Sequence, residues 1–123
     1  MPLIRDEPGV LTISLPQNAS RTVVKATIVA IKTVLRRGAR FVLRIDGTEL
    51  RRGDLTFIPV LVKELRKAEP ELRSFLRGTA VVVGSASARC ILCAVLKLKP
   101  PVAPIRVTED PLAAEEFVAQ LPV

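Results

Sequence analysis

The sequence predicts a single α/β domain over residues 1–123, with a mixed, mostly parallel central sheet of about five strands and about four helices. Segments with strand-like apolar patterns alternate along the chain with segments whose apolar residues recur at helical spacing. Neither an internal repeat nor a low-complexity tail interrupts this alternation. Helices that connect successive strands imply right-handed crossovers between parallel strands.

The first third of the chain predicts two strands and a helix. Residues 10–15 put Leu11, Ile13 and Leu15 on one side and Val10, Thr12 and Ser14 on the other, as a half-buried strand does. Residues 2–5 form a short partner strand across a turn at 7–9. Ser20 fits the N-cap of a helix that ends near Gly38. The buried face of this helix is predicted to hold Val24, Ile28, Ile31 and Leu35.

A central strand and a second helix follow. Residues 40–46 form a β-branched and apolar run that ends at Asp46 and Gly47, which predicts a strand followed by a loop. Pro59 has no N–H group, so it fits the first turn of a helix capped by Thr56. The predicted buried face of this helix consists of Phe57, Ile58, Leu61, Val62 and Leu65, and Pro70 ends the helix.

The next segment predicts a strand between two helical stretches. Residues 71–76 form a short helical turn, and the continuous apolar run 79–83 is typical of a strand covered on both faces. A very apolar helix follows, capped by Ser85 or Ser87 and continuing to about Leu98.

The C-terminal segment predicts a last strand and a last helix. A proline-rich linker at 99–104 leads into a short strand at 105–107. Asp110 as N-cap and Pro111 at the first helical position predict where the final helix begins. Its inward-facing side chains are predicted to be Leu112, Val118 and Leu121.

The amino-acid composition limits the classes of function that the protein can have. The chain has 19 Lys and Arg against 12 Asp and Glu, no His, and a formal net charge of +7. Without His the commonest general base and the commonest metal ligand are missing, so we expect a non-enzymatic protein without a cofactor. The positive charge favours acidic partners, while 4 Phe and no Trp or Tyr leave little for stacking on exposed bases.

The sequence also indicates the cellular compartment in which the protein is expected. The N-terminal residues do not have the pattern of a signal peptide, and the two cysteines form no disulfide framework. The longest apolar-rich stretch, residues 90–98, is about half of the ~20 residues that a bilayer-spanning helix needs. We therefore expect a reduced cytoplasmic protein without a transmembrane segment.

The order of elements, together with residues 44–67, resembles the STAS domain family of anti-sigma factor antagonists, related bacterial signalling proteins and cytoplasmic parts of anion transporters. In that family a central strand ends in an Asp, and a second Asp begins an Asp-Ser-Ser-Gly-like segment that opens the next helix. Here Asp46 and Asp54 hold these positions, and residues 55–57 read Leu-Thr-Phe. By the resemblance, Thr56 occupies the position that is phosphorylated in the family.

The resemblance implies a regulatory or scaffold module that binds a protein partner through loop 47–56 and the following helix. The partner would be a regulatory kinase, an anti-sigma-like protein or another component of a signalling complex. The implied partner-binding residues are Asp46, Arg51, Arg52, Asp54 and Thr56.

Thr56 has two interpretations. A hydroxyl at a helix N-cap faces unpaired backbone N–H groups and the positive end of the helix dipole, where a phosphoryl group is stabilised. Leu55 and Phe57 depart from the polar and Gly positions of the family motif, so the chain could keep the fold without the switch. A plain structural cap is therefore the alternative to phosphorylation at Thr56.

Two further patterns have ordinary explanations. Cys90 and Cys93 form a CxxC whose apolar flanks favour burial as small hydrophobic side chains, and two cysteines alone cannot complete a zinc site, so no metal is predicted. Residues 84–87 follow a strand and open a helix, where α/β sheets bind phosphates. Ser85 and Ser87 are therefore candidate anion-binding residues, with a simple N-cap as the alternative.

Two other functions stay open. The net charge supports a basic nucleic-acid-binding α/β domain, and the aliphatic content suggests a binder of an apolar or anionic lipid-like ligand. An unpaired edge of the sheet could support a homodimer, although no residue pattern demands one. The basic residues near helix ends and loops are Arg36, Arg37, Arg40, Arg51, Arg52, Arg66, Lys67, Arg73 and Arg77.

Overall fold

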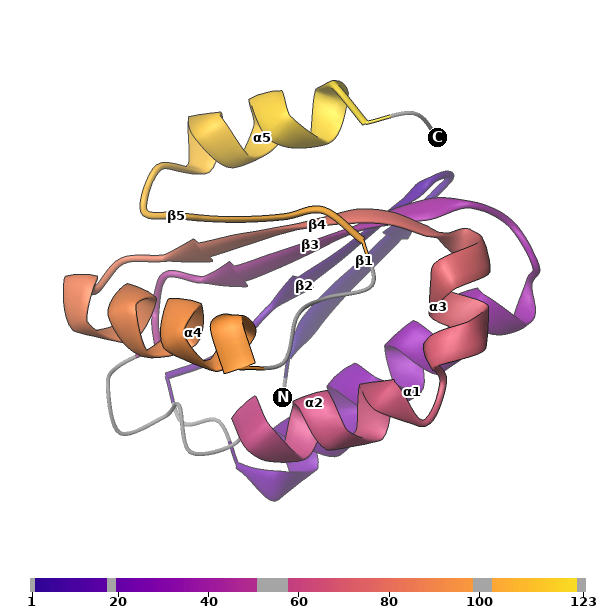
Figure 1. The fold of residues 1–123 in the computed structure, drawn as a ribbon, viewed down its shortest axis with the longest axis horizontal. Helices are drawn as coiled ribbons and strands as arrows, with labels where there is room; N and C mark the ends of the chain where they lie inside the picture. Colours follow the sequence, from indigo (N-terminus) through magenta and orange to yellow (C-terminus); the bar gives the residue numbers. More distant parts are fainter. Residues whose placement is uncertain (1, 18–19, 51–57, 99–102, 122–123) are drawn as a thin grey trace.

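The computed structural model describes residues 2–17, 20–50, 58–98 and 103–121, apart from the side chains of 95–98 (Figure 1). The helices of this part of the chain lie on both sides of one sheet, with α1 to α4 on one side and α5 on the other. In chain order the elements are β1 (Leu3–Glu7), β2 (Val10–Ser14), α1 (Arg21–Arg36), β3 (Phe41–Gly47), α2 (Ile58–Arg66), α3 (Glu69–Phe75), β4 (Leu76–Val83), α4 (Ala86–Leu98), β5 (Ile105–Thr108) and α5 (Pro111–Ala119).

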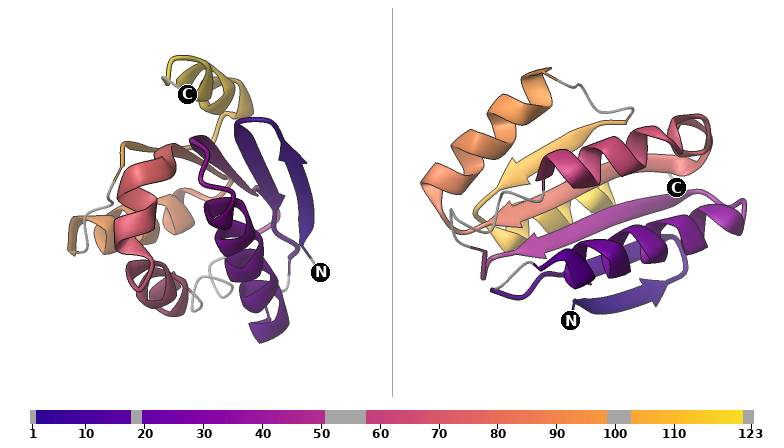
Figure 2. Two further views of the ribbon diagram at one scale, coloured as in Figure 1. Left: turned by 90° about the vertical axis from the view of Figure 1, so that its right-hand side faces the viewer. Right: turned by 90° about the horizontal axis from the view of Figure 1, so that it is seen from below.

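The strands lie in the sheet in the same order as in the chain. β1 pairs antiparallel with β2, whereas β2, β3, β4 and β5 are parallel neighbours. Each crossover therefore moves across the sheet in the same direction, and right-handed crossovers then place their helices on the same face. Figure 2 shows α1, α2 and α4 together on that face. The α/β class and the mixed, mostly parallel sheet are as predicted.

Local sequence signals set the ends of several elements. The Ser20 side chain accepts a hydrogen bond from the Val23 backbone N–H at 3.4 Å, and the Asp110 side chain accepts one from the Leu112 N–H at 3.0 Å. The tight turn between β1 and β2 contains Gly9 with φ of 80°, a backbone conformation that side chains disfavour. Both N-cap predictions and the N-terminal strand pair are confirmed.

The core lies mainly between the sheet and the helices α1 to α4, and β4 belongs to it on both faces. Its fully buried side chains include Leu11, Ile13 and Ile31. On the opposite face, Ala80 and Val82 of β4 form a smaller cluster with α5. The prediction that residues 79–83 are covered on both faces is confirmed, since all of them are buried.

The segment after β3 differs from the prediction. The described part contains five helices rather than about four, because the short helical turn predicted at 71–76 is a helix of its own, α3. Pro70 lies in the first turn of α3, where its missing N–H costs nothing, instead of ending the preceding helix. On α2, Ile58 is buried and Leu61, Val62 and Leu65 are half-buried, while Phe57 lies outside the described residues.

Val118 of α5 packs on the sheet as predicted, but the predicted burial of Leu112 and of the two cysteines of α4 is wrong. Leu112 is 60% exposed, because α5 packs on the sheet through Ala114, Phe117 and Val118 on its other side. Cys90 and Cys93 are exposed rather than buried, since α4 turns Ala88, Ile91 and Leu92 toward the core. Both helices carry apolar residues around much of their circumference, so the sequence pattern does not fix which side faces inward.

Replacing Ile31 tests the packing of α1. Ile31 is fully buried and Val29, two residues earlier, is 62% exposed. Ile31→Ala is expected to lower the free energy of unfolding by about 2–5 kcal/mol, because the removed methyl groups leave a cavity. Val29→Ala, the matched control, should change it by less than about 0.5 kcal/mol. Urea unfolding followed by circular dichroism measures both, and equal losses would contradict the orientation of α1.

Candidate partner-binding surface

Asp46 is the one predicted partner-binding residue among those the structure describes. It lies near the end of β3, and its Oδ1 accepts a hydrogen bond from the Thr48 backbone N–H at 3.1 Å. This contact turns the chain out of the sheet at the strand's carboxyl end. The other predicted residues, Arg51, Arg52, Asp54 and Thr56, lie outside the described residues.

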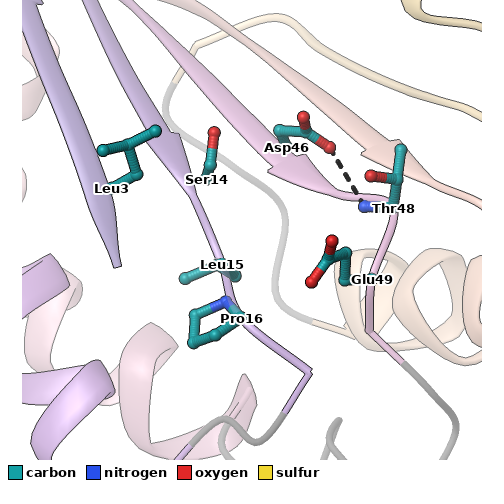
Figure 3. A pocket seen from close by; sticks show the side chains of 7 residues that line it. All are labelled: Leu3, Ser14, Leu15, Pro16, Asp46, Thr48 and Glu49. Carbon is teal, nitrogen blue, oxygen red and sulfur yellow. Dashed lines mark hydrogen bonds between the residues drawn. The ribbon is translucent and has the colours of Figure 1, made fainter. Parts of the chain in front are cut away.

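A shallow, open hollow of about 220 Å³ lies beside Asp46, at the carboxyl ends of β2 and β3 (Figure 3). The polar part of its lining consists of the carboxylates of Asp46 and Glu49 and the hydroxyls of Ser14 and Thr48. The apolar part consists of Leu3, Leu15 and Pro16. Ligands of α/β sheets commonly bind at this edge. Two carboxylates here favour a basic or hydrogen-bond-donating group over an anion.

The predicted anion-binding residues lie at the start of α4. The Ser85 hydroxyl accepts a hydrogen bond from the Ala88 backbone N–H at 3.3 Å, which is the contact of an N-cap. Ser87 is exposed in the first turn of the helix. The cap interpretation of Ser85 is confirmed, and anion binding at Ser85 and Ser87 stays a prediction.

The outer side of α1 carries positive charge along its length. Arg21, Lys25, Lys32 and Arg36 follow one another at spacings that put them on one face of the helix. The helix contains no acidic residue. Arg21, Lys25 and Arg36 are exposed and Lys32 is half-buried, so these side chains lie outside the buried stripe of the helix.

The neighbouring helix α2 extends this positive face. Lys63, Arg66 and Lys67 are exposed on α2 and just after it, and α2 lies beside α1 (Figure 2). Lys67 Nζ lies 3.0 Å from Glu64 Oε1. That hydrogen bond lowers the pKa of Glu64, and the charges of Lys67, Lys32 and Lys63 lower it further. Lys32 belongs to α1, and α1 contacts α2, so the basic side chains of the two helices lie on the same side of the sheet.

We call this basic region the α1–α2 surface. It also contains two exposed aliphatic side chains, Val29 on α1 (62% exposed) and Val60 on α2 (53% exposed). Val60 lies one helical turn before Lys63, and Val29 lies between Lys25 and Lys32. The basic residues of the surface are Arg21, Lys25, Lys32, Arg36, Lys63, Arg66 and Lys67.

Fewer basic side chains form ion pairs with carboxylates on this surface than in the rest of the described chain. Here the contact of Lys67 with Glu64 is the one described ion pair. At the end of α1, the hydrogen bond from Arg37 to Asp6 raises the pKa of Arg37. The described ion pairs away from the surface join Arg5 to Glu7, Arg37 to Asp6, Arg44 to Glu115, Arg73 to Glu69 and Arg89 to Glu109.

Sequence reasoning identified only part of this surface. It grouped Arg36, Arg66 and Lys67 among the basic residues near helix ends, and it placed Lys32 and Lys63 outside the apolar faces of their helices without joining them to that group. The signal for Lys32 and Lys63 was their position opposite the apolar stripe of each helix. Their positions form one surface only because α1 and α2 are neighbours in the fold, which the sequence does not show.

Two other features are missing from the described part of the chain. None of its helices is long and apolar enough to cross a membrane. The same residues contain no group of three or more His, Cys, Asp or Glu side chains that could hold a metal ion.

The titration of Glu64 tests the convergence of α1 and α2. The pKa of its carboxyl is lowered in the folded protein, so the ionised form stabilises the fold above the unfolded-state pKa, and this contribution is lost as the pH falls through the lowered value. Lys67→Gln should raise the pKa most, and Lys32→Gln should raise it less. NMR detection of the Glu64 carboxyl carbon measures these shifts, with Arg21→Gln as the control. No response to Lys32→Gln would mean that the two helices do not bring their charges together.

We compared the chain with known protein families, curated proteins and solved structures, and no match was found. The function proposed for this chain therefore depends on its own residues and their geometry.

Proposed function

We propose that this chain is a non-enzymatic regulatory module that binds a protein partner with an acidic surface through the α1–α2 surface and the loop 47–56 that leads into α2. One observation carries the proposal. Basic residues line the outer sides of α1 and α2, these two helices lie side by side, and the contact of Lys67 with Glu64 is the one described ion pair among them. Such a face steers and orients an acidic partner.

The finer form of the proposal is a STAS-like module. It is supported by the element order, by Asp46 at the end of the central strand, and by the helix that follows the loop. The partner would then be a regulatory kinase, an anti-sigma-like protein or another signalling component. Thr56 lies two positions before Ile58, the first residue of α2. Its phosphorylation would add negative charge just before this basic helix in the sequence.

Nucleic acid is the second candidate, since phosphates also bind basic faces. Two observations favour a protein. Exposed Val29 and Val60 interrupt the basic residues, and apolar side chains at the centre of an interface stabilise protein contacts. No described aromatic ring is fully exposed for base stacking, because Phe41 is buried and Phe75 and Phe117 are half-buried.

A lipid-like ligand is the third candidate. The hollow beside Asp46 is open to solvent and bordered by two carboxylates. An apolar chain gains affinity from an enclosed apolar cavity, and anionic head groups are repelled by carboxylates. The hollow therefore gives this candidate little support.

Charge reversal on the α1–α2 surface tests the proposal. The tagged protein captures partners from a nuclease-treated extract, and the partner found by mass spectrometry is purified and titrated. Lys32→Glu with Lys63→Glu is expected to weaken binding by about tenfold or more, because like charges facing each other at an interface cost several kcal/mol. The affinity of the wild type should fall as salt is added.

The matched control is Arg5→Glu with Arg106→Glu, which changes the net charge equally at exposed sites on β1 and β5. This control should bind like the wild type. Equal weakening by both double variants would show only a general charge effect, and retention of RNA instead of protein would favour the nucleic-acid alternative.

Thr56 is tested separately. Thr56→Glu adds a negative charge where the resemblance places a phosphoryl group, so it should reduce binding of an acidic partner several-fold. Thr56→Gln, which is neutral and similar in size to Thr56→Glu, should bind like the wild type. The same titration measures both variants, and identical affinities for all three proteins would remove Thr56 and its modification from the proposal.

A further inference from the structure

Two thiols stand on the outer side of α4, away from the α1–α2 surface. Cys90 and Cys93 are both exposed and neither is in a disulfide. Ala88 is fully buried, and Ile91 and Leu92 pack against the core, so the opposite side of the helix faces solvent. Both cysteines lie on that side.

The spacing makes the two thiols neighbours. Residues three apart on a helix lie on one face, with Cβ atoms about 5–6 Å apart. Two of the residues that border the pair, Ala86 and Ala94, are exposed and small, and both cysteines are themselves exposed. The pair is therefore open to a ligand from solution.

The same spacing disfavours a disulfide between them. A disulfide requires Cβ atoms about 3.5–4.5 Å apart, which is closer than an intact helix places them. A cation bound between two sulfurs has no such requirement. In a linear complex with two metal–sulfur bonds of about 2.3 Å, the sulfurs lie roughly 4.6 Å apart. A helix can hold two side chains three residues apart at this separation without a backbone shift.

The ligand set selects the cation. Zinc takes four ligands in structural sites, and the described residues offer no third His, Cys, Asp or Glu beside the pair. Thiolates prefer soft cations, and Cu⁺ is stable with two sulfur ligands in a linear arrangement. Arg89 lies four residues before Cys93 on the same helix, and its Nη2 lies 3.8 Å from Glu109 Oε2, so its charge is paired with a carboxylate.

We propose that Cys90 and Cys93 form a surface dithiolate site for a single soft monovalent cation, Cu⁺. Binding replaces the two thiol protons: one Cu⁺ joins both sulfurs, two protons leave, and the complex carries one negative charge. No electron is transferred, and the site is independent of the proposed protein-binding function.

An anaerobic titration of the reduced full chain with Cu⁺, in competition with the chromophoric chelator bicinchoninate, tests the site. The wild type should take up one Cu⁺ per chain and remain monomeric by size-exclusion chromatography if it is monomeric without the cation. Cys90→Ser and Cys93→Ser should each weaken binding by more than the roughly 10–100-fold that loss of an outer-shell partner costs, since each removes a direct ligand. Ala94→Ser, which keeps both thiols on the same helix face, should bind like the wild type.

Two results would overturn the site. One is Cu⁺ binding that survives either single cysteine variant. Another is a stoichiometry of one Cu⁺ per two chains. Circular dichroism of every variant checks that α4 is intact, so a loss of binding is not confused with a loss of fold.

Discussion

The handedness of the crossovers, acting on strands that keep their chain order, is the constraint on which the rest of the structure depends. Because β2 to β5 advance across the sheet in one direction, right-handed connections put α1, α2 and α4 on one face. The buried stripes of these helices share one core with Leu11, Ile13 and Phe41 of the sheet. The last helix, α5, follows the last described strand and covers the opposite face of β4.

That arrangement determines the surface as well as the core. Each helix must bury its apolar stripe, so its basic residues are left on the outside. Placing α1 beside α2 then joins two basic faces that are separated in the chain by the whole of β3 and the loop after it. Elsewhere, as at Arg37 and Asp6, charge is neutralised across elements, whereas around Glu64 the cations outnumber the carboxylate.

Much of the fold could be predicted because its signals are local. The caps at Ser20 and Asp110 and the alternation in β2 depend on residues a few positions apart. The outward side of α4, with Cys90 and Cys93, could not be predicted, because a helix that is apolar around much of its circumference gives no clear periodic signal. The candidate surface was missed for a different reason: its charges become neighbours only through the packing of α1 on α2. Of the predicted partner-binding residues, the structure describes Asp46 alone.

Footprinting in the presence of the purified partner tests the central claim most directly. Lysines are labelled with an amine-reactive reagent and arginines with a dicarbonyl reagent, and mass spectrometry measures each modification with and without the partner. The account predicts that Lys25, Lys32, Lys63 and Lys67 lose reactivity together, while Arg106, which is exposed on β5, keeps it. Protection of Arg106 with the four lysines unchanged would contradict the account, because the partner would then bind a face other than the one formed by α1 and α2.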